Sequence, residues 1–74
     1  MAKYVLVHSP SPRLSSLTEA WVFDNSIDVY NEMLAQYSRS IKNNQVLGKA
    51  ISSMCAHTVM QDGAVETWRI IEAS

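Results

Sequence analysis

The sequence predicts an α+β domain: an antiparallel four-stranded sheet (β-β-α-α-β-β) with helices packed on one face. Three observations support this fold class. Runs rich in β-branched and aromatic residues lie at both ends of the chain, an amphipathic helical pattern lies between them, and an Asp-Gly pair divides the last two runs. A single small domain over residues 1–74 accounts for the whole length.

Two strands are expected before the helices. The first covers residues 3–8, where four β-formers follow one another. Residues 9–17 contain two prolines, which donate no backbone hydrogen bond, so this stretch is expected to be a stiff loop. The second strand covers residues 18–23, and its alternation places Trp21 and Phe23 on the same face.

Two helices are expected next. Asn25 or Ser26 caps the first, which should run to about Lys42 and bury one apolar stripe. That stripe consists of Tyr30, Met33, Leu34, Tyr37 and Ile41. Apolar residues between Val46 and Met54 also follow a helical period, but out of phase with the first stripe, which predicts a second, short helix.

Asp62-Gly63 predicts a hairpin between residues 55–61 and 64–71, because a tight two-residue turn needs positive φ angles. The expected cross-strand pairs are Met60 with Val65, Thr58 with Thr67, and His57 with Trp68.

Composition excludes several classes of protein. Six Lys and Arg against seven Asp and Glu give a net charge of −1, which disfavours both a strongly basic nucleic-acid binder and an acidic decoy. The single cysteine and the lack of a targeting or membrane-spanning segment indicate a cytoplasmic protein without a membrane partner. A core this small favours added stability from a homodimer or a larger partner.

No motif for catalysis, cofactor binding or a metal is present, so no catalytic, cofactor-binding or metal-binding residue is assigned. Cys55 and His57, with His8, are the nearest approach to a soft-metal site or a Cys–His nucleophile. These three residues are too few ligands for a metal site, and the sequence offers no oxyanion hole for a Cys–His nucleophile. A small oligomeric enzyme or metal protein therefore stands only as an alternative.

The strongest indication of function is that the strands contain more aromatic residues than the core can bury. Helices on one face cannot cover every ring, so Trp21 and Trp68 are expected to form an exposed apolar patch that binds a partner. Further candidates for partner contact are Arg13 in the proline-rich loop and an acidic ridge along the first helix. The ridge comprises Asp24, Asp28 and Glu32, although a solvated helix start, with acids matched to the helix dipole, is the favoured explanation of these residues.

The very short chain, the β-β-α-β-β plan, the single cysteine and the lack of a catalytic motif resemble small phage-encoded inhibitors of bacterial defence systems, including anti-CRISPR proteins. The resemblance is one of size and layout over the whole chain. It implies a stoichiometric inhibitor in the host cytoplasm that blocks nucleic-acid binding or nuclease recruitment by its target.

We therefore expect a non-enzymatic inhibitor or adaptor that binds the surface of a larger protein or protein complex. The alternative is a small nucleic-acid-binding module, although nucleic acid is a less favoured partner. Its phosphate contacts would come from Arg13, Arg39, Lys42 and Lys49.

Overall fold

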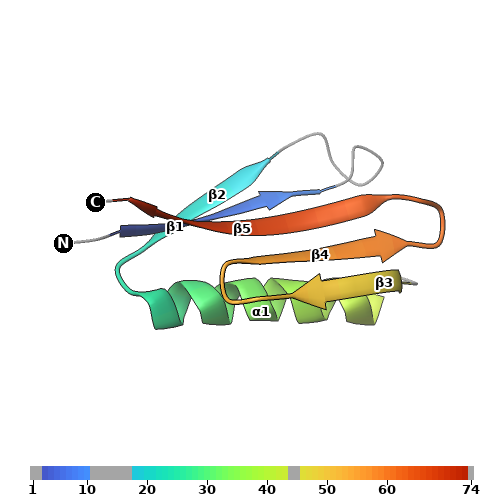
Figure 1. Cartoon of the computed structure of the whole chain (residues 1–74), viewed down its shortest axis with the longest axis horizontal. Helices are drawn as coiled ribbons and strands as arrows, with labels where there is room; N and C mark the ends of the chain where they lie inside the picture. Colours follow the sequence, from blue (N-terminus) through green and yellow to red (C-terminus); the bar gives the residue numbers. More distant parts are fainter. Residues whose placement is uncertain (1–2, 11–17, 44–45, 74) are drawn as a thin grey trace.

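The computed structural model describes residues 3–10, 18–43 and 46–73, which form one antiparallel sheet of five strands and one helix (Figure 1). The α+β class is compatible with the prediction, but the predicted four strands and two helices are wrong. In chain order the elements are β1 (Lys3–Ser9), β2 (Glu19–Phe23), α1 (Ser26–Asn43), β3 (Val46–Ile51), β4 (Cys55–Met60) and β5 (Val65–Ala73).

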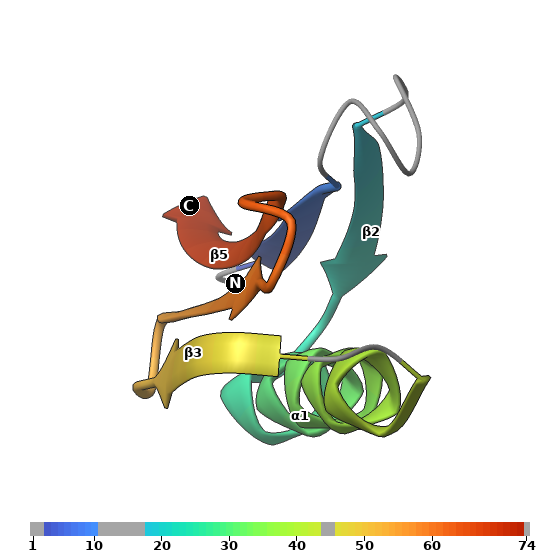
Figure 2. The ribbon, with the colours of Figure 1, turned by 90° about the vertical axis from the view of Figure 1, so that its right-hand side faces the viewer.

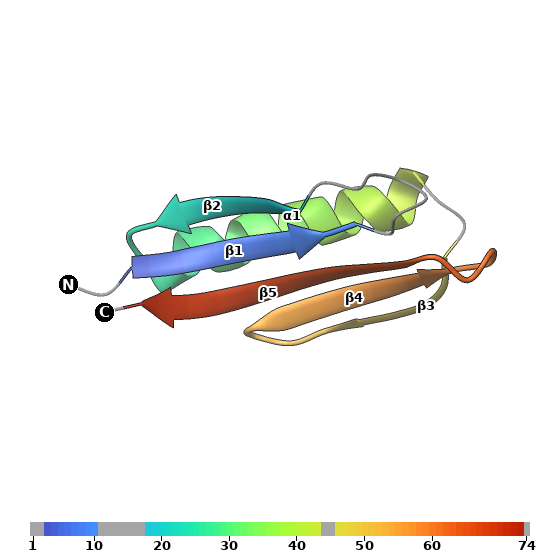
Figure 3. The same ribbon diagram turned by 90° about the horizontal axis from the view of Figure 1, so that it is seen from above.

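The strands lie in the order β2-β1-β5-β4-β3 (Figure 3). The first and last strands of the chain therefore pair with each other at the middle of the sheet, with Lys3 opposite Ala73. Both outer strands are joined to their neighbours along the chain, β2 to β1 and β3 to β4. This arrangement places β5 at the centre, with two strands on each side.

Helix α1 packs against one face of the sheet, and Figure 2, which looks almost along the helix, shows the strands on one side of it. The core fills the space between these two layers. It comprises Leu6, Val29, Met33, Tyr37, Ala56, Trp68 and Ile70. No described element covers the opposite face of the sheet.

The predicted second helix is strand β3. Apolar residues from Val46 to Met54 fit a helical period, but a window of nine residues fits a strand as well. Val46 and Ile51 are β-branched, Gly48 is a poor helix former, and pairing with β4 satisfies the backbone. A register shift between Val46 and Gly48 interrupts the strict alternation that would have indicated a strand.

The hairpin between β4 and β5 exists, but its register differs from the prediction by one residue. The loop has three residues: Met60 N–H donates to the Ala64 carbonyl at 2.8 Å, and Gly63 N–H donates to the Met60 carbonyl at 2.9 Å. Gly63 has a φ of 89°, as the last residue of such a loop requires. His57 therefore pairs with Thr67, so it points away from the face that holds Trp68.

Helix α1 begins and ends close to the predicted residues. Asn25 caps it by accepting a hydrogen bond from Asp28 N–H at 2.8 Å. Its buried face is rotated from the predicted stripe, because the buried positions are Val29, Met33, Tyr37 and Ser40. No helix in the described ranges is long and apolar enough to cross a membrane.

Candidate functional site

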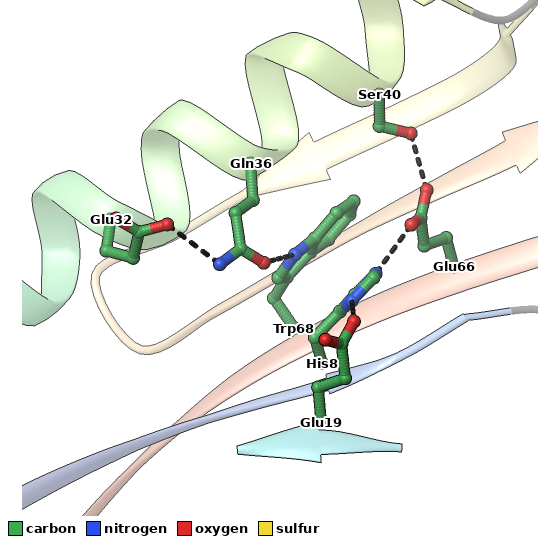
Figure 4. Close-up of polar contacts among 7 residues, drawn as sticks. All are labelled: His8, Glu19, Glu32, Gln36, Ser40, Glu66 and Trp68. Carbon is green, nitrogen blue, oxygen red and sulfur yellow. Dashed lines mark hydrogen bonds and ion pairs between the residues drawn. The ribbon is translucent and has the colours of Figure 1, made fainter. Parts of the chain in front are cut away.

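A hydrogen-bonded cluster of three polar side chains lies between α1 and the sheet (Figure 4). His8 on β1, Ser40 on α1 and Glu66 on β5 contribute to it. The Glu66 carboxylate accepts from Ser40 Oγ at 2.5 Å through Oε1, and His8 Nε2 lies 2.5 Å from Oε2. The side chains of His8 and Glu66 are only 13% and 10% exposed, so these are hydrogen bonds inside the protein, where loss of one partner is costly.

Two indoles hold the imidazole of His8 in place. Its ring stacks on Trp68 with a centroid distance of 5.0 Å and an interplanar angle of 13°, and on Trp21 at 6.5 Å and 25°. Tyr37 meets Trp68 edge-on at 6.1 Å. Cross-strand pairing places His8 opposite Glu19 on one side and Trp68 on the other. The stacked rings keep the two imidazole nitrogens directed at Glu19 and Glu66.

The order of the hydrogen bonds is not that of a catalytic triad. In a triad the histidine stands between the nucleophile and the carboxylate, and takes the proton of the nucleophile. Here Glu66 stands between Ser40 and His8, and His8 Nδ1 faces Glu19 Oε1 at 3.6 Å. The group that accepts the hydrogen bond of the Ser40 hydroxyl is therefore the Glu66 carboxylate.

A second chain of hydrogen bonds fixes Trp68 to the helix. Trp68 Nε1 donates to Gln36 Oε1 at 3.0 Å, and Gln36 Nε2 donates to Glu32 Oε2 at 2.9 Å (Figure 4). The indole N–H therefore has a hydrogen-bond partner although only 2% of Trp68 is exposed.

A pocket of about 370 Å³ opens beside the buried cluster, between α1 and the end of the sheet where β2 lies. His8, Glu66 and Trp68 are part of its wall. Its remaining lining consists of Glu19 and Trp21 from β2 and Gln36, Arg39, Ser40 and Asn43 from α1. This pocket, called the polar pocket below, brings two glutamates and one arginine to the same cavity.

The face of the sheet opposite α1 is the second candidate site, called the open face below. Strand pairing places on it Lys3, Val5, Val7, Ser9, Ala20, Val22, Cys55, His57, Val59, Val65, Thr67, Arg69 and Ile71. Val22 is 67% exposed and Ile71 is 45% exposed. A hollow of about 440 Å³ lies among Val7, His57, Arg69 and their neighbours.

The paired strands place no carboxylate on the open face, although Asp24, which follows β2, reaches Lys3 at the end of that face. All seven acidic residues of the chain lie on the helix side of the sheet, in α1 or in connections: Glu19, Asp24, Asp28, Glu32, Asp62, Glu66 and Glu72. Lys3 at its edge is paired with Asp24. Arg69, on the central strand, forms no ion pair with any described residue.

The two tryptophans predicted to bind a partner both lie on the helix side. Trp68 is buried in the core, and Trp21 is half-buried against it. The open face is therefore lined by aliphatic side chains and Arg69 in place of indoles. The expected patch of exposed indoles is therefore absent from the described residues, because the sheet places both tryptophans on the side that α1 covers.

The predicted acidic ridge is not a single surface. Asp24 precedes the helix and pairs with Lys3, Asp28 hydrogen-bonds to the capping residue Asn25, and Glu32 belongs to the chain that holds Trp68. Arg13 lies outside the described residues.

The residues of the two alternative sites, for a metal or nucleophile and for phosphate contact, lie on different parts of the fold. Cys55 and His57 lie on the open face, whereas His8 lies beneath the helix, so the three do not meet. The described residues contain no group of three or more His, Cys, Asp or Glu side chains placed to hold a metal ion. Of the basic residues proposed for phosphate contact, Arg39 and Lys42 lie on α1 and Lys49 on β3. Arg39 lines a pocket together with two glutamates.

Sequence reasoning missed Glu66, Ser40 and Arg69. A signal for Glu66 existed, because it alternates with Ala64, Trp68 and Ile70 and thus shares their buried face. No comparable local signal marks Arg69, since its importance depends on where the acids of other strands lie.

Comparison of the chain with known protein families, curated proteins and solved structures finds no match. The functional assignment therefore rests on the geometry of the two candidate sites.

Proposed function

We propose that this chain is a non-enzymatic protein-interaction domain that binds, through its open face, a partner protein with an apolar and acidic surface. The observation that carries the proposal is the charge of that face. Exposed aliphatic side chains surround Arg69, and no carboxylate of the chain lies among them. An apolar patch with a polar group of one sign is typical of a protein interface.

Charge argues against a second copy of the chain as the occupant. Two open faces packed together would bring two Arg69 side chains into one interface whose nearest carboxylate, that of Asp24, is already paired with Lys3. Burial of unpaired like charges is costly, so a face-to-face homodimer is disfavoured. A different protein that supplies one or more carboxylates within an apolar surface pairs with Arg69 instead.

This mode of binding fits an inhibitor or an adaptor. The open face consists of paired strands, so little conformational entropy is lost when a partner covers it. A partner covered over this area loses access to its own ligands there, which is how a stoichiometric inhibitor acts. We include an inhibitor of a defence system among the proposed roles, on the resemblance in size and layout.

Cys55 allows the contact surface to be tested directly, because it is the single cysteine and pairs with Arg69 across the strands. A photoactivated cross-linker on Cys55 would be illuminated in extract from the cells that naturally produce the chain. We expect a heterologous product whose cross-linked peptide, identified by mass spectrometry, contains Asp or Glu within an apolar segment.

The matched control places the same cross-linker on the outer face of α1. Ala35 is exposed there, so the control is Ala35→Cys combined with Cys55→Ser. We expect no heterologous product from position 35. Equal products from both positions, a product from position 35 only, a product that joins two copies of this chain, or no product from Cys55 would each overturn the proposal.

A further inference from the structure

We propose that the polar pocket binds a small zwitterion, such as a free amino acid or a dipeptide, between Arg39 on α1 and Glu19 on β2. The proposal concerns the helix side of the sheet and is independent of the open face. The structural feature that carries it is a cavity whose deep polar groups are bonded to one another, while one group of each charge at its rim is available to a ligand.

The polar side chains in the deep wall of the pocket are bonded to neighbouring side chains. Glu66 is bonded to His8 and Ser40, and Gln36 is bonded to Trp68 through its oxygen and to Glu32 through its nitrogen. These side chains shape the cavity. Their hydrogen bonds to one another hold them in fixed positions in the wall, so they define the shape of the cavity that a ligand meets.

At the rim of the pocket, Arg39 and Glu19 have few contacts with other side chains. Arg39 forms no ion pair and no side-chain hydrogen bond with any described residue. Glu19 makes one long contact, 3.6 Å from His8 Nδ1, and its side chain is 57% exposed. A guanidinium binds a carboxylate through two parallel hydrogen bonds, and a carboxylate binds an ammonium group. Arg39 lies on α1 and Glu19 on β2, so a ligand with one carboxylate and one ammonium group can contact both across the pocket.

The volume of the pocket and the indole of Trp21 in its wall both suit a small zwitterion. A volume of about 370 Å³ equals that of roughly twelve water molecules at ~30 Å³ each, which admits an amino acid or a dipeptide but not a large cofactor. Trp21 adds an indole wall beside Glu19, against which the apolar part of the ligand can pack.

The test is a titration of the folded chain followed by two-dimensional amide NMR, with the indole N–H of Trp21 as the local probe. The ligands are alanine, leucine and alanyl-alanine as zwitterions, with propylamine and propionate as compounds of a single charge. We expect saturable shifts at Trp21 with at least one zwitterion, and at least tenfold weaker binding of propylamine and propionate.

Variants locate the two charges. Arg39→Gln and Glu19→Gln should each weaken zwitterion binding at least tenfold, whereas Arg69→Gln on the open face should leave it unchanged. The dispersion of the amide spectrum checks that each variant is folded. The proposal is overturned when no zwitterion gives a saturable shift, when propylamine or propionate binds as well as the zwitterions, or when Arg39→Gln binds like the unaltered chain.

Discussion

The carboxylate of Glu66 and the imidazole of His8 meet at 2.5 Å in the space between α1 and the sheet, where both side chains are almost completely buried. A buried polar pair of this kind adds little net stability when it is intact, but removal of one member leaves the other without its partner. The pair therefore makes the register of β1 against β5 a strict requirement, since a slip by one residue would send Glu66 to the other face.

The first prediction tests this pairing by a double-mutant cycle. His8→Phe and Glu66→Leu should each lower the free energy of unfolding by about 2–3 kcal/mol, because each leaves a buried polar group unpaired. The double variant should lose about 1–3 kcal/mol less than the sum of the two. Urea denaturation measures all four free energies.

The exposed pair Lys3 and Asp24 is the control for this cycle. Substitution of these two residues should give a coupling energy below about 1 kcal/mol, as is usual for exposed ion pairs. Equal coupling energies for the two pairs would show that the His8–Glu66 contact is not a buried interaction.

The second prediction concerns Thr58, which is completely buried opposite Glu66 and whose hydroxyl has no hydrogen-bond partner among the described residues. Thr58→Val keeps the shape of the side chain and removes the unsatisfied hydroxyl. It should raise the free energy of unfolding by about 1 kcal/mol. Thr67→Val, at an exposed position of the next strand, should change it by less than about 0.5 kcal/mol. A loss of stability in Thr58→Val would show that the hydroxyl has a partner in solution.

The third prediction separates the two glycines. Neither would bring an added Cβ within 4 Å of another atom, but Gly63 has a φ of 89°. Gly63→Ala should therefore cost about 1–2 kcal/mol from backbone strain alone. Gly48→Ala should be neutral or stabilise the chain by up to about 1 kcal/mol, because it reduces the entropy of the unfolded state. Thermal unfolding distinguishes the two outcomes, and similar melting temperatures for both variants would contradict the three-residue loop.

The fourth prediction places the indoles by fluorescence. The Trp21→Phe variant retains only Trp68, whose emission should be shifted to short wavelength and poorly quenched by acrylamide. The Trp68→Phe variant retains only the half-buried Trp21 and should be quenched more strongly. Equal quenching constants would contradict the burial of Trp68 beneath α1.

Local signals were sufficient to predict the elements with strong patterns. The run from Tyr4 to Val7, the cap at Asn25 and the turn at Asp62-Gly63 each predicted an element within one or two residues of its observed bounds. Strand β3 was missed because its short apolar run fits two periods, and only its non-local pairing with β4 decides between them.

The candidate sites were harder to predict for the same reason. A loop of three residues in place of two turns the whole of β5 relative to β4, which moves Trp68 away from His57 and opposite Ala56. The open face follows from the pairing of β5 with β1, two strands separated by nearly the whole chain. No local pattern specifies that pairing, so neither the exposed Arg69 nor the buried His8–Glu66 contact could be assigned from spacing.

The most direct test of the proposed binding surface is the dissociation constant of the protein cross-linked through Cys55, measured for two matched charge reversals. Arg69→Glu should weaken binding by about 100-fold, equivalent to ~3 kcal/mol, because it places a carboxylate opposite the carboxylates of the partner. Arg39→Glu, on the helix side, should change binding less than about threefold. A loss of binding in Arg39→Glu with unchanged binding in Arg69→Glu would contradict the assignment of the open face as the interface.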